Sequence, residues 1–136
     1  MAEVDEATEV WAAVAAGACD AKSGDDTVAL DVGDVLAITD YFVITSATNT
    51  RLVRTITEEV EQQVAAAGGP RPLRIEGLYD LRWVLMDYGG FVVHVFLDEA
   101  RRYYELERLW ADVPRLDWWS AIRPAADATP TRRSGR

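Results

Sequence analysis

The chain has little of several residue types on which common protein sites depend. It contains one cysteine, Cys19, and one histidine, His94, in 136 residues. A structural zinc site usually needs four such ligands and a disulfide needs two cysteines, so we expect no metal, no cofactor and no internal disulfide. A single cysteine also fits the cytosol, where thiols stay reduced.

Long apolar runs and a positively charged start are missing too. The longest apolar stretches cover about ten residues, well short of the roughly 18 that cross a bilayer. The first six residues hold acidic but no basic side chains, whereas a secretory signal begins with positive charge. We therefore expect a cytoplasmic protein that does not span a membrane.

The motifs of common enzyme classes are absent as well. The sequence has no Gly-x-Ser-x-Gly turn, no Walker loop and no Gly-x-Gly-x-x-Gly fingerprint. Asp40, Asp87 and Asp98 border predicted strand ends, where carboxylates hold magnesium in phosphoryl-transfer enzymes. Such enzymes also carry two close acids on one strand and a Gly-Ser loop, which this chain lacks. We interpret the three aspartates as caps and turn residues, and the protein as a non-enzyme.

The charge is unevenly distributed along the chain. Residues 1–40 hold ten acidic side chains and one lysine, residues 41–113 hold eleven acids and eight arginines, and residues 114–136 hold two acids and five arginines. The total of −9 repels phosphate backbones and is compatible with a basic protein partner. We therefore expect little direct contact with nucleic acid, except through the basic end of the chain.

Hydrophobic periodicity predicts three helices, at about residues 5–22, 50–67 and 99–112. Thr48 and Asn49 precede the second helix and Asp98 the third, and all three are residue types that cap helix starts. The expected apolar stripes are Ala7, Val10, Trp11, Val14, Ala15 and Ala18 in the first helix, and Tyr103, Leu106, Trp110 and Val113 in the third.

Short runs rich in Val, Ile and aromatic residues predict five strands. Their ranges are Thr27–Val32, Tyr41–Ser46, Leu73–Glu76, Trp83–Tyr88 and Phe91–Leu97. Since a strand, a helix and a strand follow one another, we expect an α/β fold, with a mixed β-sheet of about five strands and helices packed on it. Residues 1–122 should form a single domain, and residues 123–136 a disordered basic tail.

The last two strands form the sharpest structural signal, a hairpin around Gly89-Gly90. Alternation places Val84, Met86, Tyr88, Phe91, Val93 and Val95 on one face, which we expect to be core. The other face carries Trp83, Leu85, Asp87, Val92, His94 and Phe96. Because it mixes aromatic residues with an acid and the only histidine, it is the better candidate for a partner-binding surface.

A purely structural role is also open for individual residues on that face. A lone histidine within a strand is usually structural, although Asp87 lies one cross-strand step from His94 and an Asp–His contact is within reach. Trp83 is either an interface anchor or a residue buried against the sheet, since tryptophan serves in both roles. For Trp118-Trp119, burial is the favoured interpretation, because the end of the chain needs an anchor.

Several segments together resemble the ribosomal silencing factor family, also called the Iojap-like family. They are Ile38–Ile44 (ITDYFVI), Glu76-Gly77, Trp83–Gly89 (WVLMDYG), Val92–Phe96 (VVHVF) and Arg102–Trp110 (RYYELERLW). The resemblance covers about residues 5–113. It implies a fold similar to that of nucleotidyltransferases but without their catalytic residues.

The resemblance also implies a task. Members of this family bind the large ribosomal subunit at a basic interface protein, large-subunit protein fourteen, and block association with the small subunit when nutrients are short. A role in large-subunit maturation is also attributed to them. The match places the interface tryptophan at Trp83, with Asp87, Tyr88 and His94 as neighbouring motif positions. This chain departs from the pattern at Gly90, where the family usually has an acid, and at Ala47, where glycine is common.

Two other functions stay open at this point. A nucleotidyltransferase-like enzyme would need a pair of metal-binding acids, and would bind nucleotides in a magnesium-dependent way. A general dimerisation or adaptor module would form complexes without a preference for ribosomes. The apolar-rich face also makes a homodimer of the free protein plausible.

Overall fold

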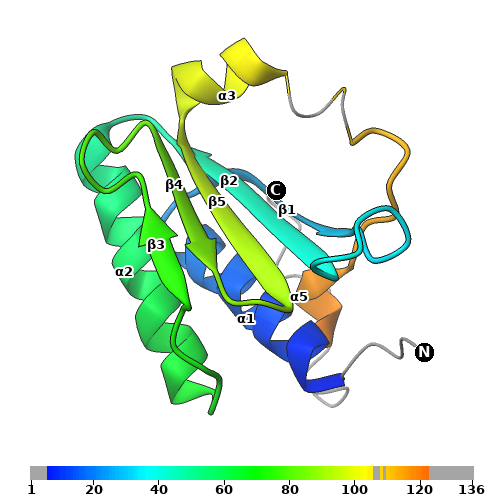
Figure 1. Ribbon diagram of the computed structural model, residues 1–136. Helices are drawn as coiled ribbons and strands as arrows, with labels where there is room; N and C mark the ends of the chain where they lie inside the picture. Colours follow the sequence, from blue (N-terminus) through cyan, green and yellow to red (C-terminus); the bar gives the residue numbers. More distant parts are fainter. Residues whose placement is uncertain (1–5, 106–107, 109, 123–136) are drawn as a thin grey trace.

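The computed structural model describes residues 6–105, 108 and 110–122. Five strands form one mixed sheet in the order β1-β2-β5-β4-β3 (Figure 1). The strands are β1 (Asp25–Asp31), β2 (Tyr41–Ala47), β3 (Arg74–Glu76), β4 (Trp83–Asp87) and β5 (Phe91–Leu97). Strands β2 and β5 are parallel and the other neighbours antiparallel, which confirms the predicted mixed α/β sheet.

Three helices, α1 (Glu6–Ala21), α2 (Thr50–Ala66) and α5 (Trp118–Ala121), pack on one face of this sheet. Figure 1 shows α1 and α2 side by side beneath the strands, with α5 next to α1. Helix α3 (Asp98–Tyr104) follows β5 at the end of the sheet farthest from the β4–β5 turn. No helix within the described residues is long and apolar enough to cross a bilayer.

The hairpin has the predicted register. Trp83 pairs with Phe96 and Leu85 with His94, and the Tyr88 N–H donates to the Phe91 carbonyl at 2.9 Å. Gly89 has a φ of 87°, a conformation that glycine adopts without steric cost. The two glycines therefore close the turn in the way that the sequence predicts.

The outer edge of β1 is covered by the chain itself. Leu30 forms a bridge with Arg115, and the N–H of Asp31 donates to the Pro114 carbonyl at 2.8 Å. The segment around Arg115 thus protects this edge and leads into α5, where Trp118 is buried against α1. The interpretation of Trp118 as an anchor for the end of the domain is confirmed.

The two long helices differ in how well the sequence predicts them. Asn49 caps α2 as expected, since its Oδ1 accepts a hydrogen bond from the Leu52 N–H at 2.8 Å. The predicted stripe of α1 is wrong at Val10, which is 44% exposed. Most of the buried positions of α1 carry small side chains instead, because the helix contacts the sheet, α2 and α5 on different sides. The buried residues are Thr8, Ala12, Ala13, Ala15, Ala16, Ala18 and Cys19.

The predicted third helix is too long. Helix α3 ends at Tyr104, and Glu105 adopts the left-handed conformation with a φ of 52°. Its N-cap is Leu97 and not Asp98, and no side chain caps it. Tyr103 is exposed, whereas Trp110 packs edge-on against Phe42 with ring centroids 5.3 Å apart. Helix α3 therefore ends before Glu105, and Trp110 lies back over the sheet. The expected tail at 123–136 lies outside the described residues.

Candidate partner-binding face

The helix-covered face of the sheet is closed. All six hairpin residues that the alternation assigns to the core are buried there, together with Val53, Ile56, Val60 and Val64 of α2. Cys19 of α1 belongs to the same cluster, and burial raises the pKa of its thiol to about 12. Its side chain therefore acts as a small apolar group. This face has no room for a partner.

The opposite face carries a smaller cluster whose buried members are Leu30, Val32, Ile44, Phe96 and Ala100. The β1 and β2 side of this face is covered by Leu36, Trp110 and Val113. On the β4 side, Trp83, Leu85 and Asp87 are only partly buried. We call these three residues of β4 the open strip; Val92, which pairs with Asp87 from β5, is partly buried as well.

Trp83 is held in place at one end of the open strip. Its Nε1–H donates a hydrogen bond to His94 Nδ1 at 3.1 Å. Its ring lies 4.9 Å from that of Phe96 and 5.1 Å from that of Tyr104, centroid to centroid. The indole is therefore anchored on two sides while part of it stays exposed, an arrangement that suits an interface anchor.

His94 is a support beneath Trp83 and not a surface residue. It is 7% exposed, and burial lowers the pKa of its imidazole to about 4. The ring is neutral at pH 7, and because Nδ1 accepts from Trp83, the proton lies on Nε2. Among the described residues, Nε2 has no hydrogen-bond partner. The aromatic environment, with Phe42 at 4.7 Å, accounts for the large desolvation.

Asp87 closes the other end of the open strip. Its Oδ1 accepts the Gly89 N–H at 2.9 Å, and its Oδ2 lies 3.4 Å from Arg74 Nε. Arg74 also lies 3.3 Å from Glu76 on the same short strand. The Asp87–His94 contact that the hairpin register allows does not form, because Asp87 is turned toward the hairpin loop and β3. The carboxylate stabilises the turn and keeps its charge at the surface.

Tyr88 and Phe96 are both interior residues. Tyr88 stacks on Phe91 at 4.5 Å on the closed face, and burial raises the pKa of its hydroxyl. Phe96 is fully buried beneath Trp83. The prediction that these two residues contact a partner is therefore corrected, since neither presents a surface. Sequence alternation finds the face of a strand but not what covers that face.

The sequence interpretation missed Tyr104, which extends the aromatic surface beyond the hairpin. Its ring contacts Trp83, and the neighbouring Tyr103 packs edge-on against it at 5.1 Å. The two consecutive tyrosines, Tyr103 and Tyr104, were an available signal in the sequence. The predicted helical stripe assigned Tyr103 to the core, and the sequence analysis therefore did not consider these tyrosines as surface residues.

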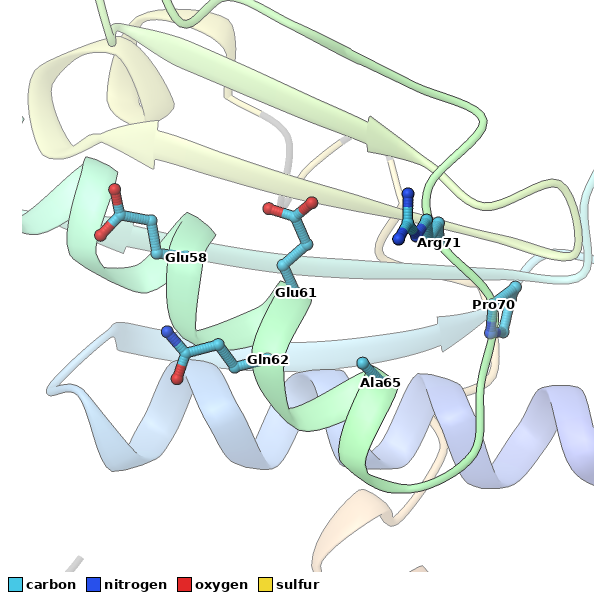
Figure 2. Close-up of a pocket in the computed structure, with 6 residues that line it drawn as sticks. All are labelled: Glu58, Glu61, Gln62, Ala65, Pro70 and Arg71. Atoms are coloured by element: carbon cyan, nitrogen blue, oxygen red, sulfur yellow. The ribbon is translucent and has the colours of Figure 1, made fainter.

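Two surface hollows lie away from the open strip. One, of about 410 Å³, is bounded by α2 and the loop after it, and Figure 2 shows Arg71 across from Glu58 and Glu61. The other, of about 490 Å³, is lined by Asp25, Asp26, Ser46, Asp98, Arg101 and Arg102. Within the described residues, no group of three His, Cys, Asp or Glu side chains is arranged to hold a metal ion.

In the second hollow, Arg101 is a structural tether. Its guanidinium donates to the Asp25 carbonyl at 3.1 Å, the Asp26 carbonyl at 3.0 Å and Ser46 Oγ at 3.3 Å. These bonds join α3 to the start of β1 and the end of β2. The arginine thereby fixes α3, and with it Tyr104, above the end of the sheet.

The profile described as "Ribosomal silencing factor during starvation" matches residues 4–135. This chain belongs to that family. The resemblance seen in the hairpin and α3 motifs is confirmed, and so is the assignment to proteins of translation regulation.

Individual proteins with related names are similar over most of this chain. The Bacillus subtilis protein named "Ribosomal silencing factor RsfS" is 41% identical over 104 residues, which is 76% of this chain and 87% of that protein. A mouse protein, "Mitochondrial assembly of ribosomal large subunit protein 1", is 34% identical over 88 residues, 62% of this chain and 38% of its own length.

Two solved structures share the fold of this family member. A crystal structure of a Chromobacterium violaceum protein superimposes with a TM-score of 0.69 and 27% identity, covering 87% of this chain and 99% of that one. A crystal structure of a Bacillus halodurans protein superimposes with a TM-score of 0.64 and 36% identity, covering 76% of this chain and 93% of that one.

Gly90, one of the two departures from the family pattern, packs against α1. A Cβ atom there would lie 2.8 Å from Thr8 Cγ2, so a larger side chain would force Thr8 to move. Ala47, the other departure, is fully buried at the end of β2. The hairpin turn of this chain therefore carries no acidic side chain next to Gly89.

Proposed function

We propose that this protein represses translation by binding the large ribosomal subunit and sterically blocking its association with the small subunit. Family membership supports a role at the ribosome, and the relatives are named as silencing or large-subunit assembly factors. Repression under nutrient limitation fits the family description, which refers to starvation. The site of action is the cytoplasm, where the two subunits join.

The open strip is the contact surface in this proposal. The observation that carries it is Trp83, a partly exposed indole fixed by His94 and Phe96. A side chain that is already ordered loses little conformational entropy on binding, which favours affinity. Leu85 and Asp87 continue the contact along β4, while His94 and Phe96 support Trp83 from inside.

The partner is a basic protein of the large subunit, large-subunit protein fourteen. The net charge of −9 favours encounter with a positive protein surface and disfavours ribosomal RNA as the main contact. Binding and steric exclusion suffice for repression, so the proposal assigns no catalytic step to any residue. It also leaves the helix-covered face of the domain free.

A subunit-joining experiment tests the proposal. Separated large and small ribosomal subunits of Bacillus subtilis are mixed with the full chain at moderate magnesium and resolved on a gradient. We expect the full-ribosome peak to fall and the protein to migrate with the large subunit. Full ribosomes forming as readily as without the protein would refute the anti-association function.

Two controls separate this function from the alternatives. Protein migrating equally with both subunits, or with neither, would point to a general adaptor module. Magnesium-dependent nucleotide binding, measured on the free protein, would favour an enzyme.

Truncation after residue 122, with binding to large subunits compared at low and high salt, shows whether the arginines at 132, 133 and 136 contact RNA, since such a contact weakens steeply with salt.

A further inference from the structure

Helix α3 places two tyrosines beside the open strip. Tyr104 is 47% exposed, and its ring lies 5.1 Å from that of Trp83, centroid to centroid. Tyr103 is 76% exposed and meets Tyr104 edge-on at the same distance. We call Trp83, Tyr103 and Tyr104 the aromatic corner. Because each ring contacts the next, the three residues form one continuous surface, to which β4 and α3 both contribute.

The rings of the aromatic corner stand at steep angles to one another. The ring planes of Tyr103 and Tyr104 are 83° apart, and those of Trp83 and Tyr104 are 53° apart. The face of an aromatic ring carries partial negative charge and attracts a cation, and rings at different angles can contact one cation from several sides. Two rings that sandwich a flat nucleobase must instead be nearly parallel. The geometry therefore suits a cationic group better than a base.

The aromatic corner is held in place from below. Arg101, which is 6% exposed, fixes α3 through its hydrogen bonds to the carbonyls of Asp25 and Asp26. The buried ring of Phe96 lies 4.9 Å from that of Trp83 and 6.4 Å from that of Tyr104, centroid to centroid. Side chains that are already ordered lose little conformational entropy when a partner binds. The corner is thus a preformed contact surface.

The arginines around the aromatic corner are matched by acids. Arg82 Nη1 lies 3.2 Å from Glu99 Oε2, and Arg108 Nη1 lies 2.7 Å from Glu105 Oε1. Arg102 borders the hollow that three aspartates line. Within the described part of α3 and its neighbours there is therefore no excess of positive charge, and the chain as a whole has a net charge of −9. Both facts favour a cation over a phosphate at the ring faces.

We infer that the aromatic corner binds the cationic side chain of a lysine or arginine of the basic protein partner, through cation–π contacts with Tyr103 and Tyr104 beside Trp83. This inference rests on the proposed function and deepens it, since it names the chemistry of the group that the partner presents and extends the contact surface from β4 to α3. A stacked RNA base is the disfavoured occupant, because of the angles between the rings and the charge of the chain.

The test measures affinity for purified Bacillus subtilis large subunits, per folded molecule. Tyr103 is the probe, because Tyr104 lies between it and Trp83 in the series of ring contacts. Tyr103→Leu should weaken binding about fivefold, since leucine keeps apolar bulk and helix propensity but has no ring face. Tyr103→Phe should stay within about twofold, because the ring face remains. Trp119→Leu, a similar change on the helix-covered side, should also stay within about twofold.

A fluorinated series at the same position distinguishes a cation from a nucleobase. In Tyr103→Phe, the new ring is replaced by analogues with one, two and three fluorine atoms, each of which withdraws negative charge from the ring face. Affinity should fall with each fluorine, down to about the level of Tyr103→Leu, because the attraction to a cation depends on that charge. Unchanged affinity across the series would overturn the inference in favour of a stacked base.

The outcomes separate this inference from the proposed function. If Trp83→Ala loses affinity while Tyr103→Leu binds like the wild type, the inference is wrong and the proposed function stands. Equal losses in Tyr103→Phe and Tyr103→Leu would assign the contact to the hydroxyl group and would overturn the inference as well. A wild-type protein that binds no large subunits contradicts both. Melting curves of each variant confirm that the compared molecules are folded.

Discussion

The two faces of this sheet both carry apolar side chains, and they are covered differently. Three helices close one face, where the hairpin residues and α2 form a continuous core. The other face is covered at β1 and β2 by Trp110, Val113 and Leu36, and is left open along β4. The difference shows that the cover over a strand, and not its composition, decides whether its residues stabilise the fold or meet a partner.

Each face buries a polar atom that has no hydrogen-bond partner among the described residues, the Tyr88 hydroxyl on the closed side and His94 Nε2 on the open side. On the open side, His94 is buried and neutral beneath Trp83, with one ring nitrogen satisfied and the other without a partner among the described residues. Unsatisfied buried groups cost stability and are often retained for a functional reason. Here the histidine orients the indole that the proposed function needs.

Truncating a large side chain on each face gives the largest expected contrast. Phe91→Ala on the closed face should lower the free energy of unfolding by about 3–5 kcal/mol, since it removes a fully buried ring stacked on Tyr88. Leu85→Ala in the open strip should cost about 1 kcal/mol or less, because the side chain is partly exposed. Urea denaturation measures both, and equal losses would mean that the open strip is core.

The pH dependence of stability isolates the buried histidine. Its pKa is about 4 in the folded protein and about 6.5 when unfolded, so the unfolded state binds the extra proton. The contribution of the neutral imidazole to the free energy of unfolding is fully present above pH 6.5. As the pH falls toward 4, the free energy of unfolding drops by roughly 3 kcal/mol. His94→Gln should show a flatter curve than the wild type over this range. Parallel curves would show that His94 is solvated.

The helix caps give the smallest expected contrast. Asn49→Ala should destabilise the protein by about 1 kcal/mol, because it removes the hydrogen bond to the Leu52 N–H. Asp98→Ala should cost less, since α3 has Leu97 as its N-cap and no side-chain cap bond. Thermal melts of both variants decide the matter. A larger loss of stability in Asp98→Ala than in Asn49→Ala would show that Asp98 caps α3 after all.

Local chemistry made parts of the fold predictable from sequence. The Gly89-Gly90 turn fixes the hairpin register, and Asn49 marks the start of α2 through a local hydrogen bond. Neither signal depends on distant residues. The α1 stripe was not predictable in this way, because seven of its sixteen residues are alanine and burial there depends on which neighbour packs on each side.

The candidate face was predictable only in part, for the same reason. Alternation correctly grouped Trp83, Leu85 and Asp87 with His94 and Phe96, but accessibility depends on Trp110 and Tyr104, which lie further along the chain. The left-handed turn at Glu105, which ends α3 early, had no sequence signal such as glycine. Tertiary packing overrode the helical periodicity.

The central claim is that partner binding resides on the open face, and a matched pair of tryptophans tests it. Trp83 and Trp119 are both partly buried, one in the open strip and one in α5 against the helix-covered core. We measure affinity for large ribosomal subunits per folded molecule, after Trp83→Ala and after Trp119→Ala. Trp83→Ala should lose about thirtyfold, or about 2 kcal/mol, and Trp119→Ala less than about twofold. Unchanged affinity of Trp83→Ala, or an equal loss in both variants, would contradict the account.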